Sequence, residues 1–200
     1  MEFLVEQPGI PRVVDPGDYS WNLKSIPCII TNRQIHFVFS CTGCQYVGFF
    51  SASLLQYDGV YRVAKGKVTL LVNDFARPNG IAFSPDEKYL YVNDTLKKTI
   101  RRFEVQPDGG IANGQVITDM NSDTRPGAPD GMKVDQKGNI YCTGPGGFWI
   151  MSPEGKHLAT VNTKELPANL GWGDADGNTL YLTARTGLYR IRLLIPGVRP

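Results

Sequence analysis

Apolar and polar positions alternate along most of the chain, in short runs separated by polar turns. A period of two residues is typical of a β-strand with one buried face, and no window of useful length keeps the 3.6-residue period of a helix. The pattern therefore predicts an all-β chain. The runs that predict strands are 60–63, 68–72, 81–83, 89–93, 99–105, 115–119, 132–134, 139–143, 148–151, 157–161, 170–172, 179–183 and 188–193.

Part of this pattern occurs three times: PNGIAFSPDEKYLYVND from Pro78, PDGMKVDQKGNIYCTG from Pro129 and ANLGWGDADGNTLYLTA from Ala168. Each copy begins with a small polar segment, continues as an apolar run, turns at Asp and Gly, and ends in a second run. The tyrosines of these second runs are 50 and 40 residues apart, which matches the roughly 40 to 50 residues of a propeller blade. A small sheet cannot bury both faces alone and must stack on copies of itself. The repeat predicts a β-propeller.

Counting strands in register predicts the second half of one blade, two complete four-stranded blades, and three strands of another. Residues 1–56 do not carry the repeat, although Ile29-Ile30 and 36–39 are strand-like. We therefore divide the chain into an atypical leader, 1–56, and propeller blades, 57–200, with about three to four recognisable blades. In closed propellers a missing last strand commonly comes from the other terminus, so the leader would have to supply it.

Composition and charge exclude several classes of protein. The net charge is only +2 and the basic residues are scattered among acids, which argues against a nucleic-acid partner. No apolar run approaches the roughly 20 residues of a membrane span. The N-terminus carries acids where a signal peptide has basic residues, so we expect a cytoplasmic protein. Cys41 and Cys44 have C-x-x-C spacing, but no second pair completes a zinc site, and two thiols near a turn is the favoured interpretation.

Residues 57 to about 193 resemble the SMP-30/gluconolactonase/regucalcin-like family of metal-dependent lactonases, which are six-bladed propellers. The phrases that carry the resemblance are DGVYRV, RPNGIAFSPDEKYLYVNDT, PDGMKVDQKGNIYCTGPGG, FWIMSPEGKHLATV and TLYLTARTGLYRIRL. The resemblance implies a metal held by a Glu near the N-terminus, the Asn of P-N-G and the Asp of P-D-G. The last two are Asn79 and Asp130 here. It also implies that Asp130 is the candidate general base.

The chain departs from the family in its first part. The E-G-P phrase that supplies the Glu ligand is absent, as is the S-P-N-D phrase; Glu6 is only a faint echo of the former. Six blades of about 45 residues need roughly 270 residues, more than the 200 present. We therefore expect weakened metal binding, impaired activity, and self-association through open blade faces.

The residue types at the two matching positions suit a hard divalent cation. Such a cation polarises a lactone carbonyl and lowers the pKa of a bound water. Calcium and magnesium select oxygen donors, and zinc can also use them; Asn79 would supply an amide oxygen and Asp130 a carboxylate. Asn169, at the same point of the third repeat, is a possible pocket residue. Alone, each residue could simply cap a turn, but their equivalent positions favour a shared site.

The leading functional interpretation is a hydrolase that opens small sugar-acid or related lactones with one divalent ion (calcium, zinc or magnesium). The alternative is a non-catalytic propeller fragment or binding module. A third interpretation, a strictosidine-synthase-like propeller, does not account for the P-N-G and P-D-G phrases. A serine hydrolase is disfavoured because the chain contains no G-x-S-x-G elbow.

Overall fold

Fifteen β-strands in four antiparallel sheets make up the regular structure of the computed structural model, which describes residues 36–41, 44–49, 58–64 and 67–198. No helix occurs within these ranges, and hence none that is long and apolar enough to cross a bilayer. The sheets, each in its strand order, are β1 (His36–Cys41), β2 (Cys44–Phe49), β3 (Gly59–Ala64), β4 (Lys67–Val72); β5 (Pro78–Phe83), β6 (Tyr89–Asp94), β7 (Thr99–Val105), β8 (Ile111–Asp119); β9 (Met132–Val134), β10 (Ile140–Gly144), β11 (Gly147–Met151), β12 (His157–Asn162); and β13 (Pro167–Gly173), β14 (Thr179–Ala184), β15 (Leu188–Arg192).

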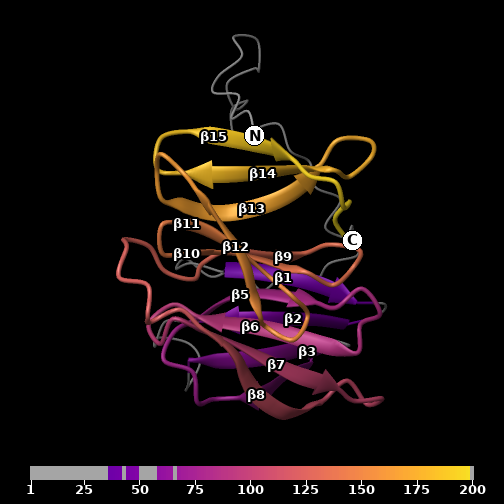
Figure 1. Cartoon of the computed structure of the whole chain (residues 1–200). Helices are drawn as coiled ribbons and strands as arrows, with labels where there is room; N and C mark the ends of the chain where they lie inside the picture. Colours follow the sequence, from indigo (N-terminus) through magenta and orange to yellow (C-terminus); the bar gives the residue numbers. More distant parts are fainter. Residues whose placement is uncertain (1–35, 42–43, 50–57, 65–66, 199–200) are drawn as a thin grey trace, which may run out of the picture.

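The first strands of successive sheets contact one another. Figure 1 shows the fourth sheet above the third, with the first and second sheets overlapping below them. Strand β5 contacts β1 on one side and β9 on the other, and β9 also contacts β13. Every sheet pairs only strands that follow one another in the sequence. This is the arrangement of propeller blades whose inner strands surround a common axis, so the predicted all-β propeller is confirmed.

Apolar side chains fill the spaces between successive sheets. Tyr91 of the second sheet packs with Met132 and Ile140 of the third, and all three are almost completely buried. Burying a large apolar side chain contributes about 1.5–3 kcal/mol, so the stacked faces stabilise one another. A second cluster joins the first two sheets, and a third joins the last two; the latter contains Tyr141, Phe148, Val161, Leu170, Leu180, Leu182 and Ile191.

The first sheet corrects the strand count that the sequence suggests. Half a blade is predicted there, whereas β1 and β2 complete a four-stranded sheet with β3 and β4. Both strands come from the segment 1–56, so the sheet crosses the boundary placed at residue 57. Cys41 and Cys44 are backbone partners at the end of the β1–β2 pair, so the C-x-x-C spacing follows from the antiparallel pairing of these strands. Residues 1–35 lie outside the described part, and a closing strand from them stays a prediction.

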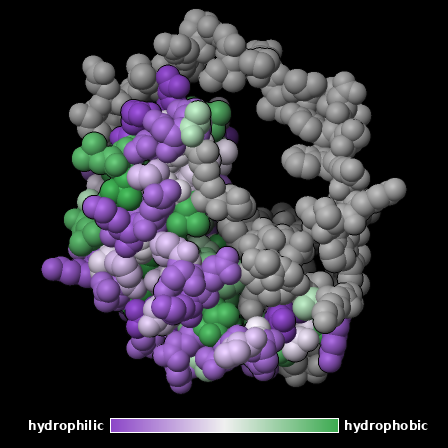
Figure 2. Space-filling view, turned by 90° about the vertical axis from the view of Figure 1, so that its right-hand side faces the viewer, coloured by the Kyte–Doolittle hydropathy of each residue, from purple (hydrophilic) through white to green (hydrophobic). Residues whose placement is uncertain are grey.

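The described surface is mainly polar. Figure 2 shows hydrophilic side chains over much of the coloured part of one face, interrupted by smaller hydrophobic groups. Exposed large apolar side chains occur on several elements, including Leu96 after β6, Val116 on β8 and Leu188 on β15. Self-association through sheet faces therefore stays a prediction.

Candidate functional site

Asn79 is the second residue of β5, and it is almost fully buried, with 5% of its surface exposed. Its amide nitrogen Nδ2 donates a hydrogen bond to Thr95 Oγ1 over 3.2 Å. Its amide oxygen Oδ1 is buried and accepts no hydrogen bond from the described residues. A buried polar atom without a partner costs about 1–3 kcal/mol, and a cation is one group that would satisfy such an oxygen.

Asp130 lies two residues before β9 of the next sheet, and its side chain is half-buried. Hydrogen bonds hold its backbone on both sides. Its N–H donates to Thr143 Oγ1 over 2.8 Å, and its carbonyl accepts from Asn93 Nδ2 over 2.8 Å. The backbone that carries the carboxylate is therefore held by partners from both the second and the third sheet.

The glycines that follow Asn79 and Asp130 bring neighbouring sheets into direct contact. A Cβ atom at Gly80 would lie 2.3 Å from the Asp130 carbonyl oxygen, and one at Gly131 would lie 2.2 Å from Asn169 Oδ1. The N–H of Gly131 also donates to the carbonyl of Ala168 over 2.9 Å. The three positions singled out by the repeat thus follow one another across three successive sheets.

Asn169 is half-buried at the third of these positions. Its Oδ1 accepts a hydrogen bond from the N–H of Leu170 over 2.8 Å, so this oxygen already supports the local turn. This hydrogen bond favours the turn interpretation, and a role for Asn169 in a substrate pocket stays a prediction.

Two residues that the sequence did not single out connect Asn79 and Asp130. Asn93, which is fully buried, accepts from the N–H of Gly80 over 3.0 Å and donates to the Asp130 carbonyl. Thr95 accepts from Asn79 and donates to the carbonyl of Pro129 over 2.7 Å. Both follow the second apolar run of the repeat, and this position was the only signal available.

Asp94 lies between these two residues but is fully engaged by the backbone. It is 1% exposed, and its carboxylate accepts hydrogen bonds from N–H groups on both sides of the site. The donors are Ala76, Arg77, Leu96 and Lys97. Asp94 is therefore a structural acid that fixes the loop before β5 against the turn after β6.

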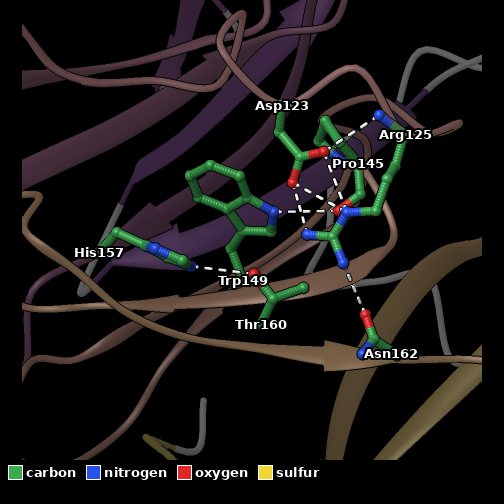
Figure 3. A network of polar contacts seen from close by, with 7 residues as sticks. All are labelled: Asp123, Arg125, Pro145, Trp149, His157, Thr160 and Asn162. Atoms are coloured by element: carbon green, nitrogen blue, oxygen red, sulfur yellow. Dashed lines mark hydrogen bonds and ion pairs between the residues drawn. The ribbon is translucent and has the colours of Figure 1, made fainter.

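The segment that leads into Asp130 is fixed by an arginine network (Figure 3). Arg125 donates to Asp123 through Nε over 3.0 Å and to Asn162 Oδ1 through Nη1 over 2.7 Å. This guanidinium lowers the pKa of Asp123 to about 2. The N–H of Gly146 donates to the carbonyl of Pro126, which ties the same segment to the turn between β10 and β11.

An equivalent contact fixes the segment before β13. Both carboxylate oxygens of Glu165 accept hydrogen bonds from Thr186, and Tyr189 donates a third from its hydroxyl over 2.9 Å. These bonds from Thr186 lower the pKa of Glu165. Glu165 is thus a structural acid.

Within the described ranges, no three His, Cys, Asp or Glu side chains lie close enough together to bind a metal ion. Among the described residues, the oxygen donors that the sequence predicts for a cation are the Asp130 carboxylate and the amide of Asn79. Glu6 lies outside the described part.

The four antiparallel sheets define a β-propeller, and the comparisons agree. The family described as the SMP-30/Gluconolactonase/LRE-like region matches residues 37–186, and the chain belongs to this family. The match starts inside the segment 1–56, at the first residues of β1.

Individual relatives are similar over only part of their length. Gluconolactonase from Zymomonas mobilis is 31% identical over 147 residues, which are 69% of this chain and 41% of that protein. A putative sugar lactone lactonase from Rhizobium meliloti is 29% identical over 120 residues, 58% of this chain and 41% of that protein. The chain therefore spans about two fifths of the length of these relatives.

Solved structures support the fold. A putative gluconolactonase structure has a TM-score of 0.71 and 26% identity, and the match covers 82% of this chain and 59% of that one. A calcium-binding protein, regucalcin, from Agrobacterium tumefaciens has a TM-score of 0.65 at 24% identity, with 82% of this chain and 60% of that one covered. The second likeness concerns the fold alone.

Proposed function

We propose that this chain carries the reaction centre of a metal-dependent hydrolase that opens small sugar-acid or related lactones. The observation that carries the proposal is the buried Oδ1 of Asn79, which has no hydrogen-bond partner among the described residues and lies next to the sheet that Asp130 precedes. The lactonase relatives support lactone hydrolysis as the reaction class.

The residues present fit one hard divalent cation. Asn79 Oδ1 and the Asp130 carboxylate would hold it, and calcium or magnesium accepts this combination of amide and carboxylate oxygens. Zinc can also use such a set. When bound, the ion polarises the lactone carbonyl and lowers the pKa of water.

The side chains and glycines of this chain have separate roles in the proposed reaction. Asp130 accepts a proton from the attacking water, because a carboxylate held by its backbone at a constant position is a suitable general base. Asn79 contributes a neutral oxygen, which leaves the charge of the ion largely uncompensated. Gly80 and Gly131 permit the close approach of three sheets, which supports a shared site at this end of the inner strands.

The small number of metal ligands also predicts low metal affinity and low activity. Affinity for a hard cation increases with the number of charged ligands, and the described residues provide one clear carboxylate at the site. We expect weak metal affinity and slow lactone turnover. Cytoplasmic location, the absence of nucleic-acid and membrane partners, and self-association remain predictions that accompany this proposal.

The test combines metal binding with hydrolysis. Purified protein is titrated with Ca²⁺, Mg²⁺ and Zn²⁺ by calorimetry, and hydrolysis of aldonolactones is followed by proton release with each ion. Asp130→Asn should abolish ion-dependent hydrolysis, whereas Asp119→Asn, at an exposed carboxylate on β8, should not. A wild-type protein with neither cation binding nor hydrolysis would favour the alternative of a non-catalytic propeller fragment.

A further inference from the structure

We propose that Thr95 is a positioning residue that orients the amide of Asn79 so that its oxygen faces the cation. This inference rests on the proposed function, because it assigns a role toward the same ion. Thr95 follows β6, and it touches neither the reacting atoms nor the ion itself; it acts through Asn79.

The hydroxyl of Thr95 lies between two groups from different sheets. Asn79 Nδ2 donates to Thr95 Oγ1 over 3.2 Å, and Thr95 Oγ1 donates to the carbonyl of Pro129 over 2.7 Å. Pro129 is the residue before Asp130. One hydroxyl therefore connects the side chain of the first proposed ligand to the backbone that carries the second.

Proton counting determines which end of the amide faces Thr95. A hydroxyl has one proton to donate, and a backbone carbonyl can only accept. The proton of Thr95 goes to Pro129, so the group of Asn79 that faces Thr95 has to be a donor. Nδ2 meets this condition, and Oδ1 is left on the opposite side of the amide, where no residue of the described part donates to it. A flipped amide would instead place an NH2 group where the cation needs an oxygen.

The surroundings hold Thr95 in place. Its N–H donates to the carbonyl of Arg77 over 2.9 Å, and the neighbouring Asp94 carboxylate accepts four backbone N–H groups. Groups that orient metal ligands typically change metal affinity by 10- to 100-fold when they are removed. Thr95 has the geometry of such a group.

The experiment compares Thr95→Val with Thr95→Ser. Valine keeps the shape but removes the hydroxyl, and we expect its dissociation constants for Ca²⁺ and Mg²⁺, measured by calorimetry, to rise 10- to 100-fold. Serine keeps the hydroxyl and should bind within about threefold of wild type. Thr118→Val is the matched control, because the buried Thr118 also donates to a carbonyl of the next sheet, Gly155, but lies on β8. It should lower stability without changing metal affinity.

A double-mutant cycle separates orientation from general stability. If Thr95 acts through Asn79, then Thr95→Val should add little to the loss of affinity already caused by Asn79→Ala. Additive losses, or unchanged affinity in Thr95→Val while wild type binds, would overturn this inference and leave the proposed function intact. A wild-type protein that binds no cation would overturn the proposed function and the role of Thr95 together.

Discussion

Gly80 of β5 lies directly against the backbone carbonyl of Asp130 in the next sheet, at a distance that leaves no room for a side chain. A Cβ atom at Gly80 would also lie 2.6 Å from Asn93 Nδ2, the group that donates to the same carbonyl. Contact between the second and third sheets at the site therefore depends on the absence of a single methyl group.

We expect Gly80→Ala to lower the free energy of unfolding by about 1–3 kcal/mol, because the added methyl group forces the two sheets apart. It should also weaken metal binding. Gly171→Ala on β13 is the control, since a Cβ there meets nothing within 4 Å; its effect should stay within about 1 kcal/mol. Urea denaturation measures the free energy of unfolding of both variants. Equal values would show that the two sheets move apart at Gly80 without a cost in stability.

Asp130→Asn should reduce lactone hydrolysis more than Asn79→Ala. The carboxylate supplies charge to the ion and accepts a proton, whereas the amide supplies only a neutral oxygen. Initial rates at saturating cation give the comparison. Small and equal losses in both variants would place the reaction centre elsewhere.

Asp94→Ala should destabilise the fold by about 3 kcal/mol or more, because four backbone N–H groups lose their acceptor in a buried place. Asp119→Ala, at an exposed acid, should change stability by less than about 1 kcal/mol. Chemical denaturation provides the measurement. A mild effect of Asp94→Ala would mean that water replaces the carboxylate at these groups.

Lys133, on β9, makes stability depend on pH. Its ammonium group is desolvated by burial, which lowers its pKa to about 8 from 10.5. The unfolded chain thus binds more protons than the folded one between these values, so the free energy of unfolding should rise as the pH increases from 8 to 10.5. Replacing the lysine should remove this rise.

The variant Lys133→Met tests this dependence. It should be more stable than wild type at pH 7, and the difference should shrink toward pH 10.5. Lys137→Met, at an exposed lysine next to the same strand, should show neither effect. Parallel curves for wild type and Lys133→Met across the whole pH range would contradict the burial of this charge.

Much of the fold could be predicted because alternating apolar and polar residues indicate strands with one buried and one exposed face. The ranges predicted for β7, Thr99–Val105, and β9, Met132–Val134, are those in the structure. β8 begins at Ile111, earlier than predicted, because Asn113 with a φ of 53° and Gly114 interrupt the apolar pattern while β7 still pairs with the strand. β1 and β2 lack the repeat, and they are recognised as part of a blade because β1 pairs with β2 and β2 pairs with β3.

The site could be predicted only in part. Equivalent positions in the repeat single out Asn79 and Asp130, because the same point of successive sheets faces the same axis. Asn93 and Thr95 could not be found in this way, since their significance lies in hydrogen bonds to another sheet, at residues 34 to 37 positions away. Such bonds depend on how the sheets dock, which sequence periodicity does not describe.

The purely sequential pairing of strands has a consequence for the order of folding. Each sheet closes short loops between consecutive strands, which is entropically inexpensive and fast. Asn79 and Asp130, by contrast, belong to different sheets and meet only when two finished sheets dock. The proposed cation site would therefore form late, and a stopped-flow signal from metal binding during refolding would time the docking of the sheets rather than the formation of their strands.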